Sequence, residues 1–196
     1  EGKCGIDKCT VVNDDSKIKI SEILGVEFKK SVKKIATLHC AGGARVKDRY
    51  VYSGIEDCTA VNLVLGGQKS CVYGCLGFGT CVKVCPFGAI KMSQGGLPVV
   101  DKDKCRACNK CVEACPKKLF SLTEETHNVF VACSSKDSGK DTKLVCPVGC
   151  IACRLCEKAC KFDAIHVIDN IAVIDYNKCT SCGECVKACP MKTIKS

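Results

Sequence analysis

The sequence predicts an α+β fold of two tandem, metal-templated units, each preceded by a strand that ends in cysteine. The first observation is composition, because 22 of the 196 residues are cysteine and most stand in tight C-x2-C-x2-C runs. The second is repetition, because these runs occur in two pairs with short alternating apolar stretches between them. The third is a small core, because aromatic residues make up 5% of the chain and tryptophan is absent. We therefore expect bound metal to contribute folding free energy.

The cysteine spacing favours metal over disulfides. Three cysteines within seven residues are placed to converge on one metal centre and are poorly placed for bridges among themselves. Zinc sites use two separated C-x2-C pairs, whereas three cysteines with a fourth after three residues are typical of ferredoxins and of cuboidal [4Fe–4S] clusters. Three runs are regular, namely Cys105-x2-Cys108-x2-Cys111-x3-Cys115, Cys150-x2-Cys153-x2-Cys156-x3-Cys160 and Cys179-x2-Cys182-x2-Cys185-x3-Cys189.

Each unit is thus predicted to be ferredoxin-like, of the bacterial 2[4Fe–4S] type. In two-cluster ferredoxins the fourth cysteine of each run binds the other cluster. The regular runs then predict three ligand sets: Cys105, Cys108, Cys111 and Cys85; Cys150, Cys153, Cys156 and Cys189; Cys179, Cys182, Cys185 and Cys160.

The fourth run, within "CVYGCLGFGTCVKVCPFGAI" (71–90), is irregular. Phe78 stands where the second cysteine belongs. The glycines of this loop give it conformational freedom, which predicts that the upstream Cys71 is recruited. The expected set is Cys71, Cys75, Cys81 and Cys115, and the alternative is a cluster with only three thiolates.

The expected secondary structure is short. "AIKM" and "LPVVD" in the first unit, and "AIHVID" and "IAVIDYNKC" in the second, predict two β-hairpins. A helix over about 56–65 is indicated by Glu56 and Asp57 at its start and by Gly66-Gly67 after its end. Helical turns are also expected directly after the last cysteine of each run, at Cys85, Cys115, Cys160 and Cys189.

A larger repeat includes the strands that precede the two pairs. "KKIATLHCAGG" (33–43) and "NVFVACSSKD" (128–137) each run from apolar residues into cysteine, and aligning Cys85 with Cys160 places Cys71 on Cys146. Six cysteines remain outside the four sets. Those proposed for a fifth cluster are Cys40, Cys58, Cys133 and Cys146, with buried thiols as the alternative.

The predicted domains follow from these motifs. They are an N-terminal remnant of an Fe–S domain with a short helix (1–28), a small α/β segment (29–70), the first ferredoxin-like domain (71–120), a strand and linker segment (121–146) and the second ferredoxin-like domain (147–196).

Charge and pattern exclude several functions. The formal charge of +9 would suit nucleic acid. However, a [4Fe–4S]²⁺ core with four thiolates carries about −2 by formal counting, so four cores offset nearly all of the excess. No platform of aromatic residues and arginine for bases is visible. No apolar stretch approaches the roughly 20 residues of a membrane span, so the chain itself is expected to be soluble. The histidines are expected to be structural or exposed, namely His39, His127 and His166.

The chain resembles the B subunit of the Rnf ferredoxin:NAD oxidoreductase complex, in its longer form with two ferredoxin pairs. The resemblance is carried by "HCAGGARVKDRYVYSGIEDCTAVNLVLGGQKSCVYGCLGFGTCVKVCPFGAI", "GLPVVDKDKC" and "VACSSKDSGK". That family also has an N-terminal membrane anchor and a small four-cysteine domain. "EGKCGIDKC" resembles the end of that domain, which makes Cys9 its last ligand. Cys4 has no counterpart, and the anchor is expected to be absent here.

The resemblance implies an electron relay at the cytoplasmic face of the cell membrane. Electrons would pass from reduced ferredoxin through the clusters to other subunits of an ion-translocating complex. The chain is expected to make no bonds of its own and to bind neither flavin nor NAD. A basic run is a candidate docking surface for ferredoxin, or an ordinary solvated face: Lys29, Lys30, Lys33 and Lys34. The alternatives are an iron–sulfur subunit of another oxidoreductase and a structural zinc protein.

Overall fold

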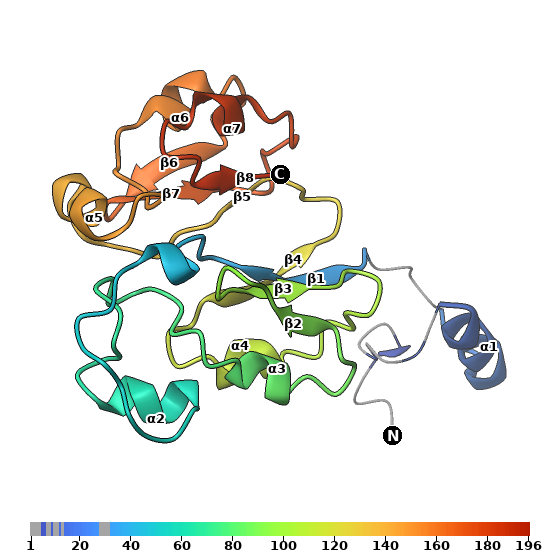
Figure 1. The fold of residues 1–196 in the computed structure, drawn as a ribbon. Helices are drawn as coiled ribbons and strands as arrows, with labels where there is room; N and C mark the ends of the chain where they lie inside the picture. Colours follow the sequence, from blue (N-terminus) through green and yellow to red (C-terminus); the bar gives the residue numbers. More distant parts are fainter. Residues whose placement is uncertain (1–4, 7–8, 10–11, 13, 28–31) are drawn as a thin grey trace.

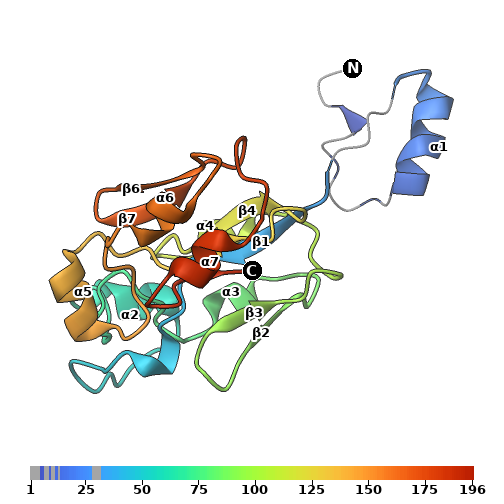
Figure 2. The ribbon, with the colours of Figure 1, turned by 90° about the horizontal axis from the view of Figure 1, so that it is seen from above.

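The computed structural model describes residues 5–6, 9, 12, 14–27 and 32–196. Two small mixed units form its body: a first unit, residues 34–124, and a second unit, residues 130–195 (Figure 1). Helix α1 (Asp14–Leu24) lies to one side of both units in the two perpendicular views (Figure 2). Cys4, Lys29 and Lys30, which carried sequence predictions, lie outside the described residues.

The first unit contains two antiparallel strand pairs and two short helices. Strand β1 pairs with β4, which is 82 or more residues later in the chain, and β2 pairs with β3 in a hairpin. The elements are β1 (Lys34–Leu38), α3 (Thr80–Lys83), β2 (Ile90–Met92), β3 (Pro98–Val100), α4 (Lys110–Ala114) and β4 (Phe120–Glu124). The predicted hairpin is confirmed.

The second unit repeats this arrangement. Strand β5 pairs with β8, and β6 pairs with β7. The elements are β5 (Phe130–Val131), α6 (Leu155–Ala159), β6 (Ile165–Ile168), β7 (Ile171–Ile174), α7 (Glu184–Ala188) and β8 (Ile194–Lys195). The second predicted hairpin is also confirmed. Its two-residue turn, Asp169-Asn170, has φ of 48° and 63°, as the twist of the flanking strands favours.

The strand that ends in cysteine completes the sheet of each unit. Residues Lys34 to Leu38 pair in register with Glu124 to Phe120, and a side-chain hydrogen bond of 2.6 Å joins Thr37 to Thr123. Strand β5 pairs in the same way with the C-terminal β8. The predicted division between residues 70 and 71 therefore separates β1 from its sheet partner.

The four short helices differ in place from the prediction. Each lies before the last cysteine of its run, and only turns follow that cysteine, so helical turns after Cys85, Cys115, Cys160 and Cys189 were wrongly predicted. The physical reason is a left-handed residue before each helix, which redirects the chain so that the third cysteine of the run falls on the first helical turn. These residues are Gly79 (φ 68°), Asn109 (φ 68°), Arg154 (φ 60°) and Gly183 (φ 79°).

Two further α-helices lie on the connecting segments. The predicted helix over 56–65 is present as α2 (Cys58–Leu63), and the Asp57 carboxylate caps it by accepting from the N–H of Thr59 at 2.8 Å. Helix α5 (Gly139–Val145) precedes the second pair of runs, and a 3-10 turn, η2 (Gly43–Arg45), follows β1.

Both apolar cores are built around cysteine. The core of the first unit includes Ile35, Ile90 and Phe120 together with Cys81 and Cys111. The equivalent core of the second unit includes Val129, Ile165 and Ile194 together with Cys150, Cys156 and Cys185. In the described part of the chain, no helix is long and apolar enough to cross a membrane.

Candidate metal centres

Five cavities are each lined by four cysteines. Three of them contain the regular sets expected from the spacing. Cys85 lies with Cys105, Cys108 and Cys111; Cys160 lies with Cys179, Cys182 and Cys185; Cys189 lies with Cys150, Cys153 and Cys156. In each set, the fourth cysteine comes from the other run of the pair, as the exchange rule of two-cluster ferredoxins requires.

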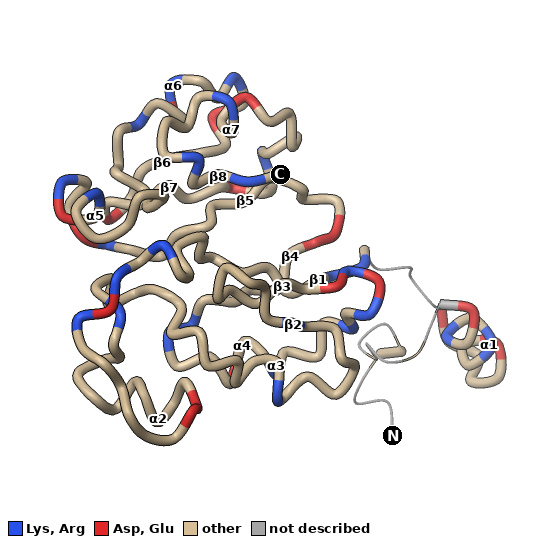
Figure 3. Tube along the Cα trace, viewed as in Figure 1, with Lys and Arg blue, Asp and Glu red and all other residues tan. Residues whose placement is uncertain are grey.

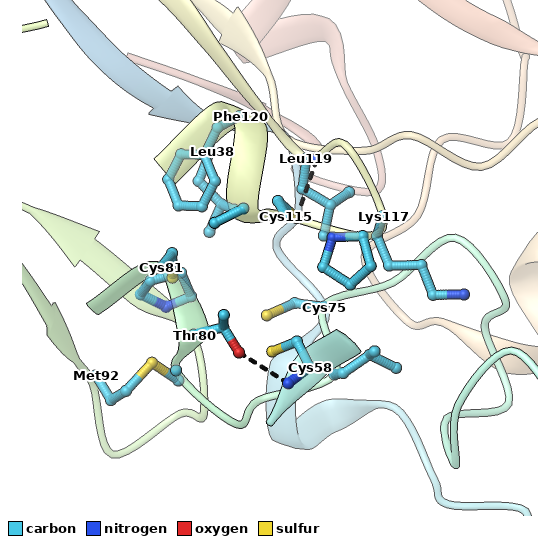
Figure 4. A pocket seen from close by; sticks show the side chains of 15 residues that line it. Leu38, Cys58, Cys75, Thr80, Cys81, Met92, Cys115, Lys117, Leu119 and Phe120 are labelled. Carbon is cyan, nitrogen blue, oxygen red and sulfur yellow. Dashed lines mark hydrogen bonds between the residues drawn. The ribbon is translucent and has the colours of Figure 1, made fainter. Parts of the chain in front are cut away.

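The fourth cavity has a different cysteine from the one expected. Its lining contains Cys58, Cys75, Cys81 and Cys115 (Figure 4). Cys58 is the first residue of α2, Cys81 is on α3, Cys115 directly follows α4, and Cys75 lies in the loop before α3. Cys71 was predicted to belong here but does not line this cavity, and Cys58 lies in the lining with the other three predicted cysteines. Phe78, at the position of the missing cysteine, instead packs edge-on against Tyr52, with ring centroids 5.7 Å apart.

Hydrogen bonds fasten the start of α2, and with it Cys58, to the start of α3. The Thr80 hydroxyl accepts from the N–H of Cys58 at 2.8 Å and donates to the Asp57 carboxylate at 2.7 Å (Figure 4). The hydrogen bond from Thr80 is the main reason that the pKa of Asp57 is lowered. Lys83, also on α3, donates to the Glu56 carbonyl at 2.7 Å. Thr80 therefore holds the backbone of a candidate ligand in place.

Local spacing could not have found Cys58, which is 17 positions before Cys75. The repeat contained the missing signal. Cys71 aligns with Cys146, and Cys146 is not needed by the regular run beside it, so the same was to be expected of Cys71.

A fifth cavity contains the cysteines that remain apart from Cys4 and Cys9. Cys40, Cys71, Cys133 and Cys146 line it, from both units. The predicted fifth set named Cys58 in place of Cys71, so one exchange between the two sets reconciles prediction and geometry. Cys9 is exposed and lines none of the five cavities.

Burial makes these thiols hard to ionise without a cation. Desolvation raises the pKa of Cys75 and of Cys81 to about 12, and that of Cys111 and of Cys156 to about 11. Iron binding requires thiolates, so binding must release these protons and supply positive charge in their place. The cavities are therefore suited to a cationic metal core.

Backbone donors that stabilise thiolates recur at equivalent positions. Four residues after the last cysteine of a run, a backbone N–H points at its sulfur. The pairs are Leu119 to Cys115 and Ala164 to Cys160, both 3.4 Å, and Thr193 to Cys189, 3.3 Å. Hydrogen bonds to cluster sulfur are one of the means by which proteins set reduction potentials. The donor set thus fits a [4Fe–4S] group at the three cavities that Cys115, Cys160 and Cys189 line.

The geometry does not favour a single ion. A tetrahedral Zn²⁺ with Zn–S of about 2.3 Å holds its four sulfurs about 3.8 Å apart. Among the described residues, no group of three or more His, Cys, Asp or Glu side chains is placed to hold one metal ion.

The three histidines make other contacts. His39 donates from Nδ1 to the Val131 carbonyl (2.8 Å), and its Nε2 hydrogen-bonds Ser121 (2.7 Å). His127 stacks on Tyr176, with ring centroids 4.6 Å apart. His166 lies beside Glu157 and Asp163. Their expected structural roles agree with these contacts.

The fold and the cavities together define a multi-cluster iron–sulfur protein of the ferredoxin type. Residues 70–119 match the family described as "4Fe-4S dicluster domain", and residues 147–163 and 172–195 each match a "4Fe-4S binding domain" family.

Similarity over nearly the whole chain is more specific. The chain is 48% identical over 194 residues to the B subunit of the Na⁺-translocating ferredoxin:NAD⁺ oxidoreductase complex of Acetobacterium woodii, covering 98% of this chain and 58% of that protein. It is 42% identical over 191 residues to the B subunit of the ion-translocating oxidoreductase complex of Methanosarcina acetivorans, covering 97% of this chain and 72% of that protein. The chain therefore belongs to the family of B subunits of the ion-translocating Rnf complexes.

The position of Cys58 gives a first prediction. We expect Thr80→Val to reduce occupancy of the first-unit site that includes Cys58, because the N–H of Cys58 loses its acceptor and the Asp57 carboxylate loses one of its two donors. Loss of such an outer contact typically costs about 10–100-fold in metal affinity. Release of iron to a chelator, followed by visible absorption, measures the effect. Thr80→Ser keeps the hydroxyl and should behave like the unchanged protein; equal loss from both variants would contradict the role of the hydroxyl.

The exchange of Cys58 for Cys71 gives a second prediction. Cys81→Ala should remove about four irons, the content of one [4Fe–4S] cluster. Adding Cys58→Ala should remove no more, because the two residues line the same cavity. Adding Cys71→Ala in place of Cys58→Ala should remove a further site. The opposite result would contradict this grouping and support the set with Cys71. In that case adding Cys71→Ala to Cys81→Ala removes no further iron, whereas adding Cys58→Ala does.

Proposed function

We propose that this chain is a relay that carries single electrons through two tandem 2[4Fe–4S] ferredoxin units. The observation that carries the proposal is the pairing of four-cysteine cavities within each unit. The proposed ligands are the three regular sets and the set with Cys58. When bound, the clusters supply one-electron redox chemistry, and the chain's own residues hold and insulate them.

Shared helices bring the two centres of a unit close together. Helix α3 places Cys81 in one cavity, and Cys85, two residues after the end of this helix, lines the other. Helix α4 does the same with Cys111 and Cys115. The second unit uses α6 and α7 in the same way. A short segment of chain thus joins each pair of centres and keeps them near one another.

The relatives supply the proposed partners. The Acetobacterium woodii protein is a subunit of a complex that joins ferredoxin to NAD⁺. By that likeness we propose reduced ferredoxin as the electron donor, other subunits of a membrane complex as acceptors, and the cytoplasmic face of the cell membrane as the location. The chain spans 58% of that relative and 72% of the Methanosarcina one.

The contacts of the lysines indicate which of them are available for docking ferredoxin. Figure 3 shows lysine and arginine in both units, interspersed with acidic residues. Lys33 pairs with Glu125 at 3.1 Å, and Lys117 donates to the Gly66 carbonyl at 2.7 Å, so both are engaged within the chain. Lys34 and Lys118 are exposed near the first unit's sites. We propose that these two contribute to docking.

Iron content tests the relay directly. After anaerobic reconstitution, the four ferredoxin-type sites should bind about sixteen irons with as many sulfides, giving a brown protein. Zinc would leave the protein colourless and free of sulfide. Eight or fewer irons per chain would remove the basis for two tandem units.

Salt dependence tests the donor. The rate at which reduced ferredoxin delivers electrons should fall as salt rises, because the Debye length shrinks from about 10 Å at 0.1 M to about 3 Å at 1 M. Lys118→Gln should lower the low-salt rate by about twofold if this charge contributes to steering. Stopped-flow absorption measures both effects, with Lys187→Gln, which alters an ion pair with Glu184 on the second unit, as the matched control. A rate independent of salt would show that charge does not steer the encounter.

A further inference from the structure

We propose that Cys40, Cys71, Cys133 and Cys146 bind a fifth cluster of the [4Fe–4S] class, held jointly by the two units where they meet. The four clusters proposed above do not require it, because their ligand sets are complete without these cysteines. The inference therefore stands on the geometry of this one cavity.

The four cysteines occupy equivalent positions in the two units. Cys40 and Cys133 each follow the strand that begins a unit, β1 and β5. Cys71 and Cys146 each stand four residues before the first cysteine of a cluster run, Cys75 or Cys150. Each unit thus contributes one cysteine of each kind to a single cavity. Cysteines at equivalent positions of the two repeats that line one cavity indicate a shared site. Unrelated buried thiols would not be expected to lie together in this way.

The hydrogen bonds at the cavity repeat the same symmetry. The N–H of Cys75 donates to the sulfur of Cys40 at 3.5 Å, and the N–H of Cys150 donates to the sulfur of Cys133 at 3.4 Å. A second donor, the N–H of Ser135, lies 3.5 Å from the sulfur of Cys133. N–H groups aimed at sulfur favour thiolate, the form that binds iron.

Glycines allow the backbone to lie close to the sulfurs of this cavity. A Cβ at Gly42 would lie 3.5 Å from the sulfur of Cys146 and 3.9 Å from that of Cys40. A Cβ at Gly74 would lie 3.6 Å from the sulfur of Cys71, and its repeat counterpart, Gly149, has no room for a Cβ beside Thr142. The backbone therefore approaches closely around a space that side chains do not fill.

Size and charge also match the other sites. The space between the lining residues, counted together with its part open to solvent, is about 340 Å³ here and about 330 to 380 Å³ at the four ferredoxin-type cavities. Cys71 and Cys146 are each only 7% exposed. The guanidinium of Arg45 donates hydrogen bonds to the backbone carbonyls of Ala41 and Gly42, two residues that line the cavity. A cationic side chain there would balance part of the negative charge of four thiolates.

The position makes the site a bridge between the units. Four-residue links join it to one cluster in each unit, from Cys71 to Cys75 and from Cys146 to Cys150. The two N–H···S bonds described above follow the same routes. A cluster held by these four cysteines would supply one-electron redox chemistry between the two units, with no bond made or broken.

Iron counts and EPR on paired variants test the site without any assay of turnover. The unchanged chain should bind about twenty irons after anaerobic reconstitution, and Cys71→Ala or Cys146→Ala should each bind about sixteen. The double variant should bind no less than either single variant, because both residues serve one cluster. EPR of the reduced variants should lose the same signal in all three. Tyr73→Phe, which changes a residue of the same cavity wall that has no thiol, is the matched control and should leave the iron count and the EPR signals unchanged.

Two results would overturn the inference. One is a count of about sixteen irons in the unchanged chain. This count decides against a fifth cluster even if a variant fails to fold, and it remains compatible with the proposed four-cluster relay. The other is additive loss in the double variant, or no loss in either single variant. Eight or fewer irons would instead contradict the proposed relay itself, so the two failures are distinguishable.

Discussion

The convergence of cysteine sulfurs on metal is the constraint on which the rest of this structure depends. The strands have two to five residues, and the helices that hold the ferredoxin-type cysteines have four to six. Elements of this length are not stable in isolation, since helices shorter than about 12 residues are marginal in water and lone hairpins are too. The buried cysteines belong to the apolar core of each unit, so the proposed ligands and the core residues form one layer. Burial raises the pKa of these thiols, so they would need a cation in the same layer in order to ionise.

Duplication explains the symmetry, and one departure from it explains the irregular run. In the second unit, all three of Cys150, Cys153 and Cys156 come from one run. In the first unit, the segment between η2 and Cys71 contains α2. This helix places Cys58 in the cavity, where the run has Phe78 instead of its second cysteine. The Asp57–Thr80 hydrogen bonds anchor that segment at one point. Cys71 is then free for the position that its counterpart Cys146 occupies.

The sequence was most informative where contacts are local. Cysteine spacing predicted which residues line three cavities, and alternation with turn residues predicted both hairpins. It was misleading where the deciding contact is distant. Nothing near Cys58 indicates a ligand, because Thr80, 22 positions away, holds it in place. The pairing of β1 with β4 also spans the whole unit. Helix positions were missed because the left-handed residue before each helix, such as Asn109 or Arg154, is not one that composition alone marks as a break.

Anomalous diffraction at the iron edge, from anaerobically grown crystals of the reconstituted chain, tests the account most directly. We expect five iron peaks, with one bordered by Cys58, Cys75, Cys81 and Cys115 and one bordered by Cys40, Cys71, Cys133 and Cys146. The peak between the units is decisive, because only a site shared by both halves places density there. A first-unit peak bordered by Cys71 with Cys58 unliganded, together with no density between the units, would contradict the account.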